Sequence, residues 1–149
     1  MIKGIKFEIP NKYDNFISKI ISRIPCDTYN WINFEQYDQV FDDNYDFLFQ
    51  RKCYSGKDFL SVLSKSDYYV VAVKLQAYPS DFNGDISEIK SFDAFEHSNC
   101  QLIIRIIDNI YVEIYLKNTH YIQIIYENAV TFDFSNIQFI TDDNDMLMV

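Results

Sequence analysis

Two strand-like runs separated by two residues constrain the fold of this chain most strongly. Residues 101–107 (QLIIRII) and 110–117 (IYVEIYLK) are rich in isoleucine, valine and tyrosine, and only Asp108 and Asn109 lie between them. A two-residue connection can join antiparallel strands but is far too short for a parallel crossover. The sequence therefore predicts an antiparallel hairpin here.

Other segments also have the apolar patterns of strands, either alternating or continuous. The opening residues IKGIKFE alternate apolar and polar side chains, which is typical of a half-buried strand. A long β-rich run, DYYVVAVKLQAYP, ends at a proline. The predicted strands outside the hairpin cover residues 2–8, 28–33, 45–50, 67–79 and 136–141.

Two main helices are predicted from apolar residues that recur at the spacing of one helical face. The first runs from Pro10 to Ile24 and includes Tyr13 in its apolar face. The second begins at Asn118, a residue type that is favoured at helix N-termini. Short helices are predicted at 55–64, with Ser55 or Gly56 near its cap, and at 91–98, with Ser91 as its cap.

Length and composition favour one folded domain over residues 1–149. The chain has 48% hydrophobic residues, enough for one good core, and only three glycines and three prolines, too few for a flexible linker. The order of elements predicts an α+β fold: a mixed, mainly antiparallel sheet with two main helices packed on one face, plus one or two short helices. The tail 142–149 is expected to be loose, unless its apolar end, 146–149, docks on a neighbour.

The negative charge of the chain is concentrated in two segments. The formal net charge is −9, and residues 35–50 and 118–149 each hold five acidic residues and no lysine or arginine. Residues 1–34 and 51–117 carry balances of +2 and −1. Local negative charge mixed with aromatic residues is typical of a surface that attracts a basic partner.

This pattern selects a set of candidate binding residues. The first acidic segment is expected to be a loop that combines carboxylates with tyrosine and phenylalanine, which supply rigid contact area at interfaces. An A- and T-rich genome would also enrich the chain in aromatic residues, and this alternative stays open. The candidates are Trp31, Tyr37, Asp38, Phe41, Asp42, Asp43, Tyr45, Asp46, Asp142, Asp143 and Asp145.

Signals for catalysis, metals and cofactors are weak. His97 and His120 lie far apart, no cysteines have ligand spacing, and the Asp-rich loops lack the pattern of calcium loops, so no metal site is expected. No glycine-rich phosphate loop occurs. Cys53 has the only basic surroundings that could activate a thiol. Glu113 is expected to pair with Arg105 across the hairpin on its solvent face.

The classes of partner and the cellular compartment are limited by features that the sequence does not contain. Basic clusters are limited to the pairs Lys3/Lys6 and Lys19/Arg23, so a nucleic-acid partner is not expected. No apolar run approaches the roughly 18 residues of a membrane span, and the N-terminus has no signal-peptide core. Three cysteines form no disulfide framework. We expect a soluble cytoplasmic protein without a cofactor, of undetermined oligomeric state.

Four stretches of the chain carry a resemblance. They are GIKFEIPNKY at 4–13, AYP at 77–79, the hairpin at 100–118 and FITDDND at 139–145. Together they resemble a family of small Gram-positive bacterial proteins catalogued as a domain of unknown function. The resemblance runs nearly end to end and is weakest over 34–66. It implies an intracellular, single-domain bacterial protein and carries over no active site.

Three functions fit these observations. The first is a non-enzymatic acidic binding protein that engages a basic protein surface, as an inhibitor or immunity-type protein does. The second is an uncharacterised small enzyme or ligand-binding domain with its site between helices and sheet. The third is a DNA mimic, which requires the two acidic segments to lie side by side in space.

Overall fold

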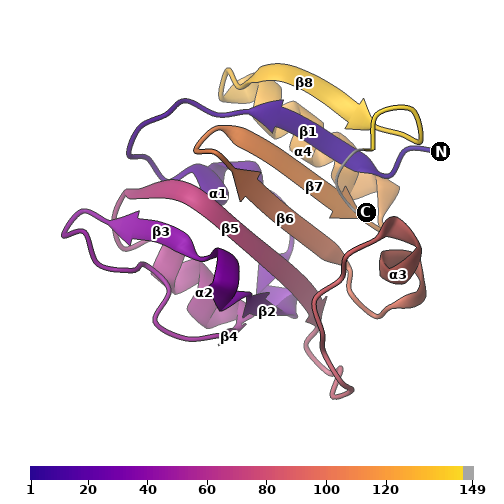
Figure 1. Cartoon of the computed structure of the whole chain (residues 1–149), viewed down its shortest axis with the longest axis horizontal. Coiled ribbons are helices and arrows are strands. Elements are labelled where there is room, and N and C mark those ends of the chain that lie inside the picture. The colour runs from indigo at the N-terminus through magenta and orange to yellow at the C-terminus, as the bar shows by residue number, and fades with distance from the viewer. Residues whose placement is uncertain (146–149) are drawn as a thin grey trace.

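The computed structural model describes residues 1–145, and its centre is one eight-stranded antiparallel sheet (Figure 1). The strand order is β4-β2-β5-β6-β7-β1-β8. Strand β3 pairs with the first part of the long strand β5, on the same edge where β2 pairs with its last part. This arrangement confirms the predicted α+β class. The strands are β1 (Gly4–Glu8), β2 (Tyr29–Asn33), β3 (Gln39–Asp42), β4 (Cys53–Ser55), β5 (Tyr68–Pro79), β6 (Leu102–Ile107), β7 (Tyr111–Leu116) and β8 (Ser135–Ile140).

The predicted hairpin is confirmed as β6 and β7. Asp108 and Asn109 connect these strands with φ values of 52° and 71°. Positive φ at both central residues is the geometry of the tight hairpin turn, and Asp and Asn tolerate it better than most residues.

Four α-helices connect or flank the strands: α1 (Phe16–Ile20), α2 (Gly56–Leu63), α3 (Phe92–His97) and α4 (Thr119–Thr131). Two short 3-10 turns are η1 (Cys26–Thr28) and η2 (Glu35–Tyr37). The predicted caps are confirmed, because side-chain oxygens of Ser55, Ser91 and Asn118 accept backbone N–H groups of the first helical turn. Over residues 1–145, no helix is long and apolar enough to cross a membrane.

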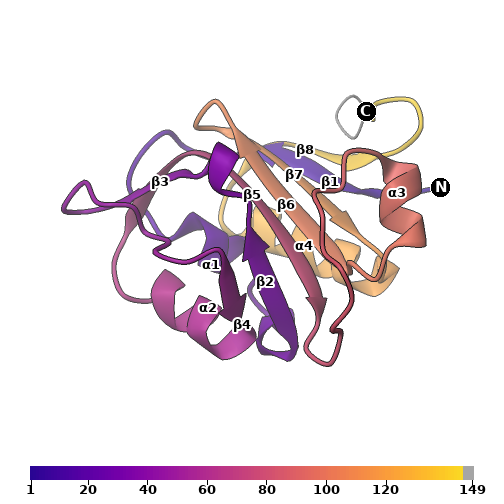
Figure 2. The ribbon, with the colours of Figure 1, turned by 60° about the horizontal axis from the view of Figure 1, so that its bottom comes forward.

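The helices lie on both faces of the sheet, which divides the core in two (Figure 2). Helices α1, α2 and α4 cover one face and bury its apolar residues in the larger core cluster. The segment 80–100 with α3 covers part of the other face, where Phe95 packs with Ile103 and Tyr115. The prediction that the main helices share a face therefore holds, and α3 is the exception.

The predicted helix from Pro10 to Ile24 is much shorter in the structure. Helix α1 has only five residues. Asp14 forms an isolated antiparallel bridge with Tyr68, whose backbone N–H and C=O groups bond to it at 3.3 and 3.1 Å. This pairing holds the residues before α1 extended, because one backbone group cannot serve a helix and a bridge at once.

The predicted strand at 45–50 is wrong, and the strand lies earlier, inside the first acidic segment. Val40 is fully buried and anchors β3 against β5. The chain then reverses, so that Leu48 N–H bonds to the Val40 carbonyl at 2.9 Å and Phe47 packs on Phe41. Tertiary packing of one valine outweighs the stronger local β-pattern that follows it.

A row of polar side chains crosses five strands on the face that carries α3. Gln138, Lys6, Glu113, Arg105 and Lys74 stand directly opposite one another on β8, β1, β7, β6 and β5. We call this set the polar row. Glu113, expected on a solvent face, is only 4% exposed.

Candidate functional site

The acidic loop after β3 is held by one of its own aspartates. Asp42 Oδ1 accepts hydrogen bonds from the backbone N–H groups of Asn44 and Asp46 at 2.9 and 3.0 Å. Aspartate commonly stabilises tight turns by such bonds. Tyr45 adopts a left-handed conformation with φ of 65°, and its side chain is 81% exposed. Asp42 is thus committed to the turn, which presents Asp43, Tyr45 and Asp46 to solvent.

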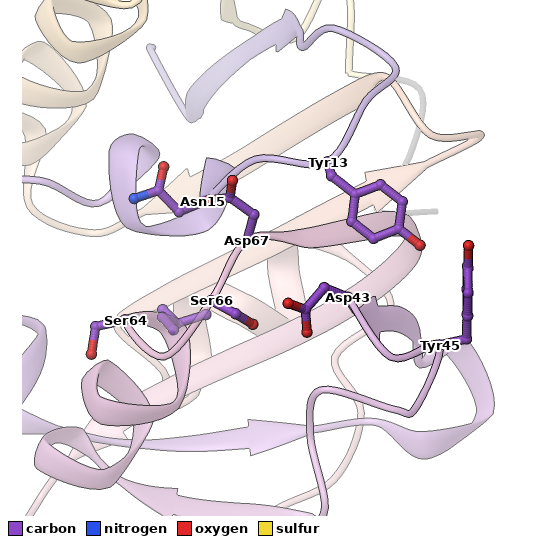
Figure 3. A pocket seen from close by; sticks show the side chains of 8 residues that line it. Tyr13, Asn15, Asp43, Tyr45, Ser64, Ser66 and Asp67 are labelled. Atoms are coloured by element: carbon purple, nitrogen blue, oxygen red, sulfur yellow. The ribbon is translucent and has the colours of Figure 1, made fainter.

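A groove of about 590 Å³ opens between this loop, the residues before α1 and the end of α2 (Figure 3). Tyr13 and Tyr45 stand at one end, and Asp43 and Asp67 lie farther along it. We call this feature the acidic groove. Its lining consists of Tyr13, Asn15, Asp43, Tyr45, Leu63, Ser64, Ser66 and Asp67.

The electrostatic character of the acidic groove is negative. Among residues 1–145, its lining includes two carboxylates and no lysine or arginine. Burial raises the pKa of Tyr13, and the nearby Tyr45 and Asp42 raise this pKa further. Carboxylates beside tyrosine rings suit a lysine or arginine side chain, which can form an ion pair and a cation–π contact together.

Exposed aromatic side chains occur in the acidic groove and elsewhere on the loop after β3. Tyr13 and Phe47 are 40% and 50% exposed, in addition to the more exposed Tyr45. Phe41 is partly buried and supports Phe47, with ring centroids 5.2 Å apart. Aromatic residues next to charged ones are typical of protein-binding surfaces.

The structure places Trp31, one of the predicted binding residues, in the core, where its side chain is fully buried. Its ring stacks on Phe59 with centroids 4.3 Å apart, and its indole N–H donates to the Cys26 carbonyl at 3.1 Å. Alternate residues of β2 point to opposite faces, and Trp31 points to the face that α2 covers. Its role is to stabilise the core.

Tyr37 and Asp38 lie outside the acidic groove. The Tyr37 hydroxyl donates to Glu88 Oε2 at 2.8 Å, so this ring belongs to the segment that crosses the other face of the sheet. Asp38 Oδ2 accepts a hydrogen bond from Asn33 at 3.1 Å, and burial raises the pKa of Asp38. Both side chains have structural contacts of their own.

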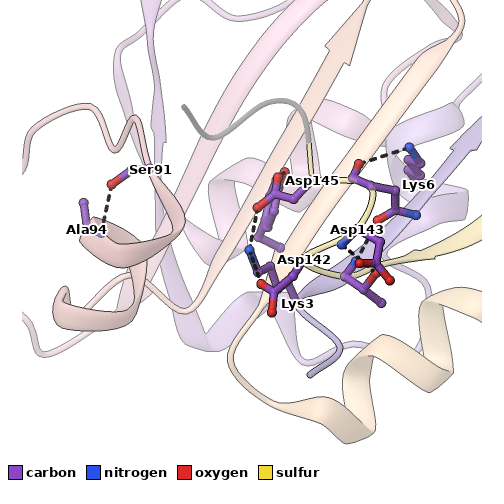
Figure 4. A network of polar contacts seen from close by, with 10 residues as sticks. Lys3, Lys6, Ser91, Ala94, Asp142, Asp143 and Asp145 are labelled. Carbon is purple, nitrogen blue, oxygen red and sulfur yellow. Dashed lines mark hydrogen bonds and ion pairs between the residues drawn. The ribbon is translucent and has the colours of Figure 1, made fainter.

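The acidic residues after β8 are largely engaged within the protein (Figure 4). Lys3 Nζ lies 3.0 Å from Asp142 Oδ1 and 2.9 Å from Asp145 Oδ2. These contacts anchor the predicted tail as far as residue 145, and Asp143 is exposed beside them. The rest of that predicted tail, 146–149, lies outside the described residues.

The first acidic segment, 35–50, and the acidic residues after β8 lie at opposite ends of the molecule (Figures 1 and 2). Asp42 pairs with Tyr68 at the start of β5. Asp145 accepts a hydrogen bond from Tyr115, which aligns through β6 with Gln76 near the far end of β5. The strand length from 68 to 76 corresponds to about 26 Å. The candidates therefore do not form one surface.

Among the lining residues that the sequence patterns missed, Tyr13 and Asp67 are the ones that supply an aromatic ring and a carboxylate. Tyr13 is predicted on the apolar face of a helix but precedes α1, and Asp67 stands one residue before β5. The bridge between Asp14 and Tyr68 brings both to the same place. The bridge between Asp14 and Tyr68 joins residues far apart in the chain, so no local sequence pattern predicts it. The position of Asp67 at the start of a predicted strand is the one signal that marks it as an exposed carboxylate.

Comparison with known proteins places the chain in a family. Residues 2–148 match the family described as "Protein of unknown function (DUF2691)". The "Uncharacterized protein YncE" of Bacillus subtilis (strain 168) is 34% identical over 148 residues, which cover 97% of this chain and 95% of that protein. No solved structure matches. The resemblance predicted from the sequence is confirmed, and the chain belongs to the DUF2691 family of proteins of unknown function.

Proposed function

We propose that the protein is a non-enzymatic binding protein whose acidic groove engages a basic protein surface. The observation that supports this most directly is a lining that combines Asp43 and Asp67 with Tyr13 and Tyr45. A lysine or arginine side chain of the partner pairs with a carboxylate there and lies against a tyrosine ring. An inhibitor or immunity-type protein that occludes a basic partner fits this arrangement.

The net charge of the chain supports the same proposal, because it favours fast association with a basic partner. A formal charge of −9 attracts a basic partner over a distance set by the ionic strength. We propose that this encounter takes place in the cytoplasm. Cys26, Cys53 and Cys100 are all free thiols, which is typical of proteins in reducing compartments.

The geometric condition for a DNA mimic is not met. Such a mimic needs its carboxylates in one continuous array, whereas the first acidic segment and the acidic residues after β8 lie at opposite ends of the sheet. Lys3 also neutralises part of the second segment through Asp142 and Asp145. We therefore do not propose this function.

Charge reversal in the acidic groove is expected to slow association with the partner. The variant Asp43→Lys/Asp67→Lys leaves Asp42 in place, because Asp42 holds the turn. With a basic partner isolated by native affinity purification, we expect the association rate at low salt to fall by about tenfold or more. Stopped-flow mixing at low and high salt measures this rate, and circular dichroism checks that the variant is folded.

A matched control separates local from overall charge. Asp81→Lys/Glu96→Lys makes the same change in net charge at two exposed positions beyond the far end of β5. It is expected to slow association much less than the groove variant. Equal slowing by both variants, or a wild-type rate that does not change with salt, contradicts the proposal.

A further inference from the structure

A second site is indicated by a buried carboxylate at the centre of the polar row. Glu113 lies on β7, between β1 and β6, and is 4% exposed. Glutamate is almost never so deeply buried unless it is paired. Within residues 1–145, however, no hydrogen bond or ion pair joins the Glu113 carboxylate to another residue.

Another charged residue of the polar row, Lys74, is buried but has bonding partners, in contrast to Glu113. Lys74 is equally buried, but its ammonium group lies 2.9 Å from Glu88 Oε2 and donates to the Ile89 carbonyl at 2.6 Å. Lys6 faces Glu113 in register, yet its Nζ reaches toward the Asn144 carbonyl at 3.4 Å (Figure 4). Burial raises the pKa of Glu113 although Arg105 and Lys6 act to lower it.

Glu113 lines an open hollow of about 360 Å³ on this face of the sheet. This volume falls within the range of small-molecule sites, roughly 300–1,000 Å³. Carboxylates of Glu8, Asp108 and Glu113 line it, against the single ammonium group of Lys6. Ile107 and the half-exposed ring of Tyr111 supply apolar wall. The hollow thus offers negative charge beside an apolar surface.

We propose that this hollow binds a small organic cation, an ammonium or guanidinium group on a short apolar stem, with Glu113 as the anchoring carboxylate. The cationic group supplies the partner that Glu113 lacks among the described residues. The stem lies against Ile107 and Tyr111. This site is separate from the acidic groove, so its test does not depend on the proposed function.

Three probes and one variant test the site. Isothermal titration at constant ionic strength uses n-butylammonium, n-butylguanidinium and, as the neutral control, 1-butanol. The wild type is expected to bind one or both cations and not the alcohol, and the two cations distinguish ammonium from guanidinium recognition. Glu113→Gln keeps the shape and removes the charge, and it is expected to weaken cation binding roughly 10- to 100-fold.

Stability provides an independent readout of the same carboxylate. An acid whose pKa is raised by folding destabilises the protein above that pKa, and the loss disappears as the pH falls through it. Glu113→Gln is therefore expected to raise Tm by about 3 °C at pH 8, with a smaller gain at pH 5. A merely structural Glu113 predicts a lower Tm for this variant.

The control variant Glu96→Gln removes one exposed carboxylate on α3 and is expected to change neither affinity nor Tm. Four results overturn the inference. They are no binding of either cation, binding of 1-butanol as tight as that of the cations, unchanged cation affinity in Glu113→Gln, and an equal loss of cation affinity in Glu113→Gln and Glu96→Gln.

Discussion

Replacement of Trp31 by alanine is expected to lower the free energy of unfolding by about 3–5 kcal/mol. The indole is fully buried, stacks on Phe59 at 4.3 Å and donates its N–H to Cys26. Truncation leaves a cavity between β2 and α2, removes the ring contact and leaves the Cys26 carbonyl without this donor.

Urea denaturation followed by circular dichroism measures this loss. Tryptophan fluorescence cannot serve for the variant, because Trp31 is the only tryptophan of the chain. Trp31→Phe is the matched control: it keeps a ring to stack on Phe59 and loses the N–H, so a smaller loss is expected. If both variants stay within about 0.5 kcal/mol of the wild type, the value typical of surface substitutions, Trp31 is not a core residue.

The substitution Asn128→Asp is expected to have the second large effect. It lowers the free energy of unfolding by about 2–4 kcal/mol at pH 7. Asn128 is 3% exposed on α4, and its amide donates to the carbonyls of Ile20 and Ser22 at 3.0 and 2.6 Å. These bonds satisfy the carbonyl end of α1. An aspartate carboxylate has the same shape but cannot donate, so it faces two acceptors and carries a buried charge.

The pH dependence of the Asn128→Asp variant has a definite sign. Burial among carbonyls raises the pKa of the new carboxyl, so part of the lost stability returns as the pH falls and the group is protonated. Arg23 bonds to the Asn128 oxygen at 3.2 and 3.3 Å and offsets some of the charge. Urea melts at pH 7 and pH 5 compare the two states. A loss that grows toward pH 5 contradicts this account.

Glu127→Gln is the control for Asn128→Asp, one position away on the same helix. Glu127 forms a surface ion pair with Arg23 at 3.1 Å, and both side chains are about half exposed. Exposed pairs of this kind contribute between about 0.2 and 1 kcal/mol. A comparable loss in both variants shows that the shared Arg23 contact, and not the Asn128 amide, joins α4 to α1.

Local signals predicted the parts of the fold that depend on a few adjacent residues. The turn at Asp108 and Asn109 and the three side-chain caps need only the chemistry of their own residues, and the structure confirms them. The helix from Pro10 to Ile24 was overpredicted, because the bridge to Tyr68 competes for its first turn. Distant pairing is invisible in a single periodic pattern.

In the acidic groove, too, local patterns predicted some residues, whereas others are brought in by contacts between distant parts of the chain. Asp43 and Tyr45 were predicted because charge and aromatic content are local properties of the acidic loop. Tyr13 and Asp67 join them only through the contact between α1 and β5. Asp142 and Asp145 were predicted to be available for a partner, whereas both form ion pairs with Lys3. The sequence does not reveal that β8 pairs with β1 beside Lys3.

The pairing of the first strand with the last has a consequence for the order in which the protein folds. In the described part of the chain, β1 pairs only with β7 and β8. A chain emerging from the ribosome N-terminus first must hold this apolar strand without a partner until residues 111–140 have appeared. Closing so long a loop is slow. The sheet is therefore completed only after residues 111–140 have been made, when β1 docks between β7 and β8.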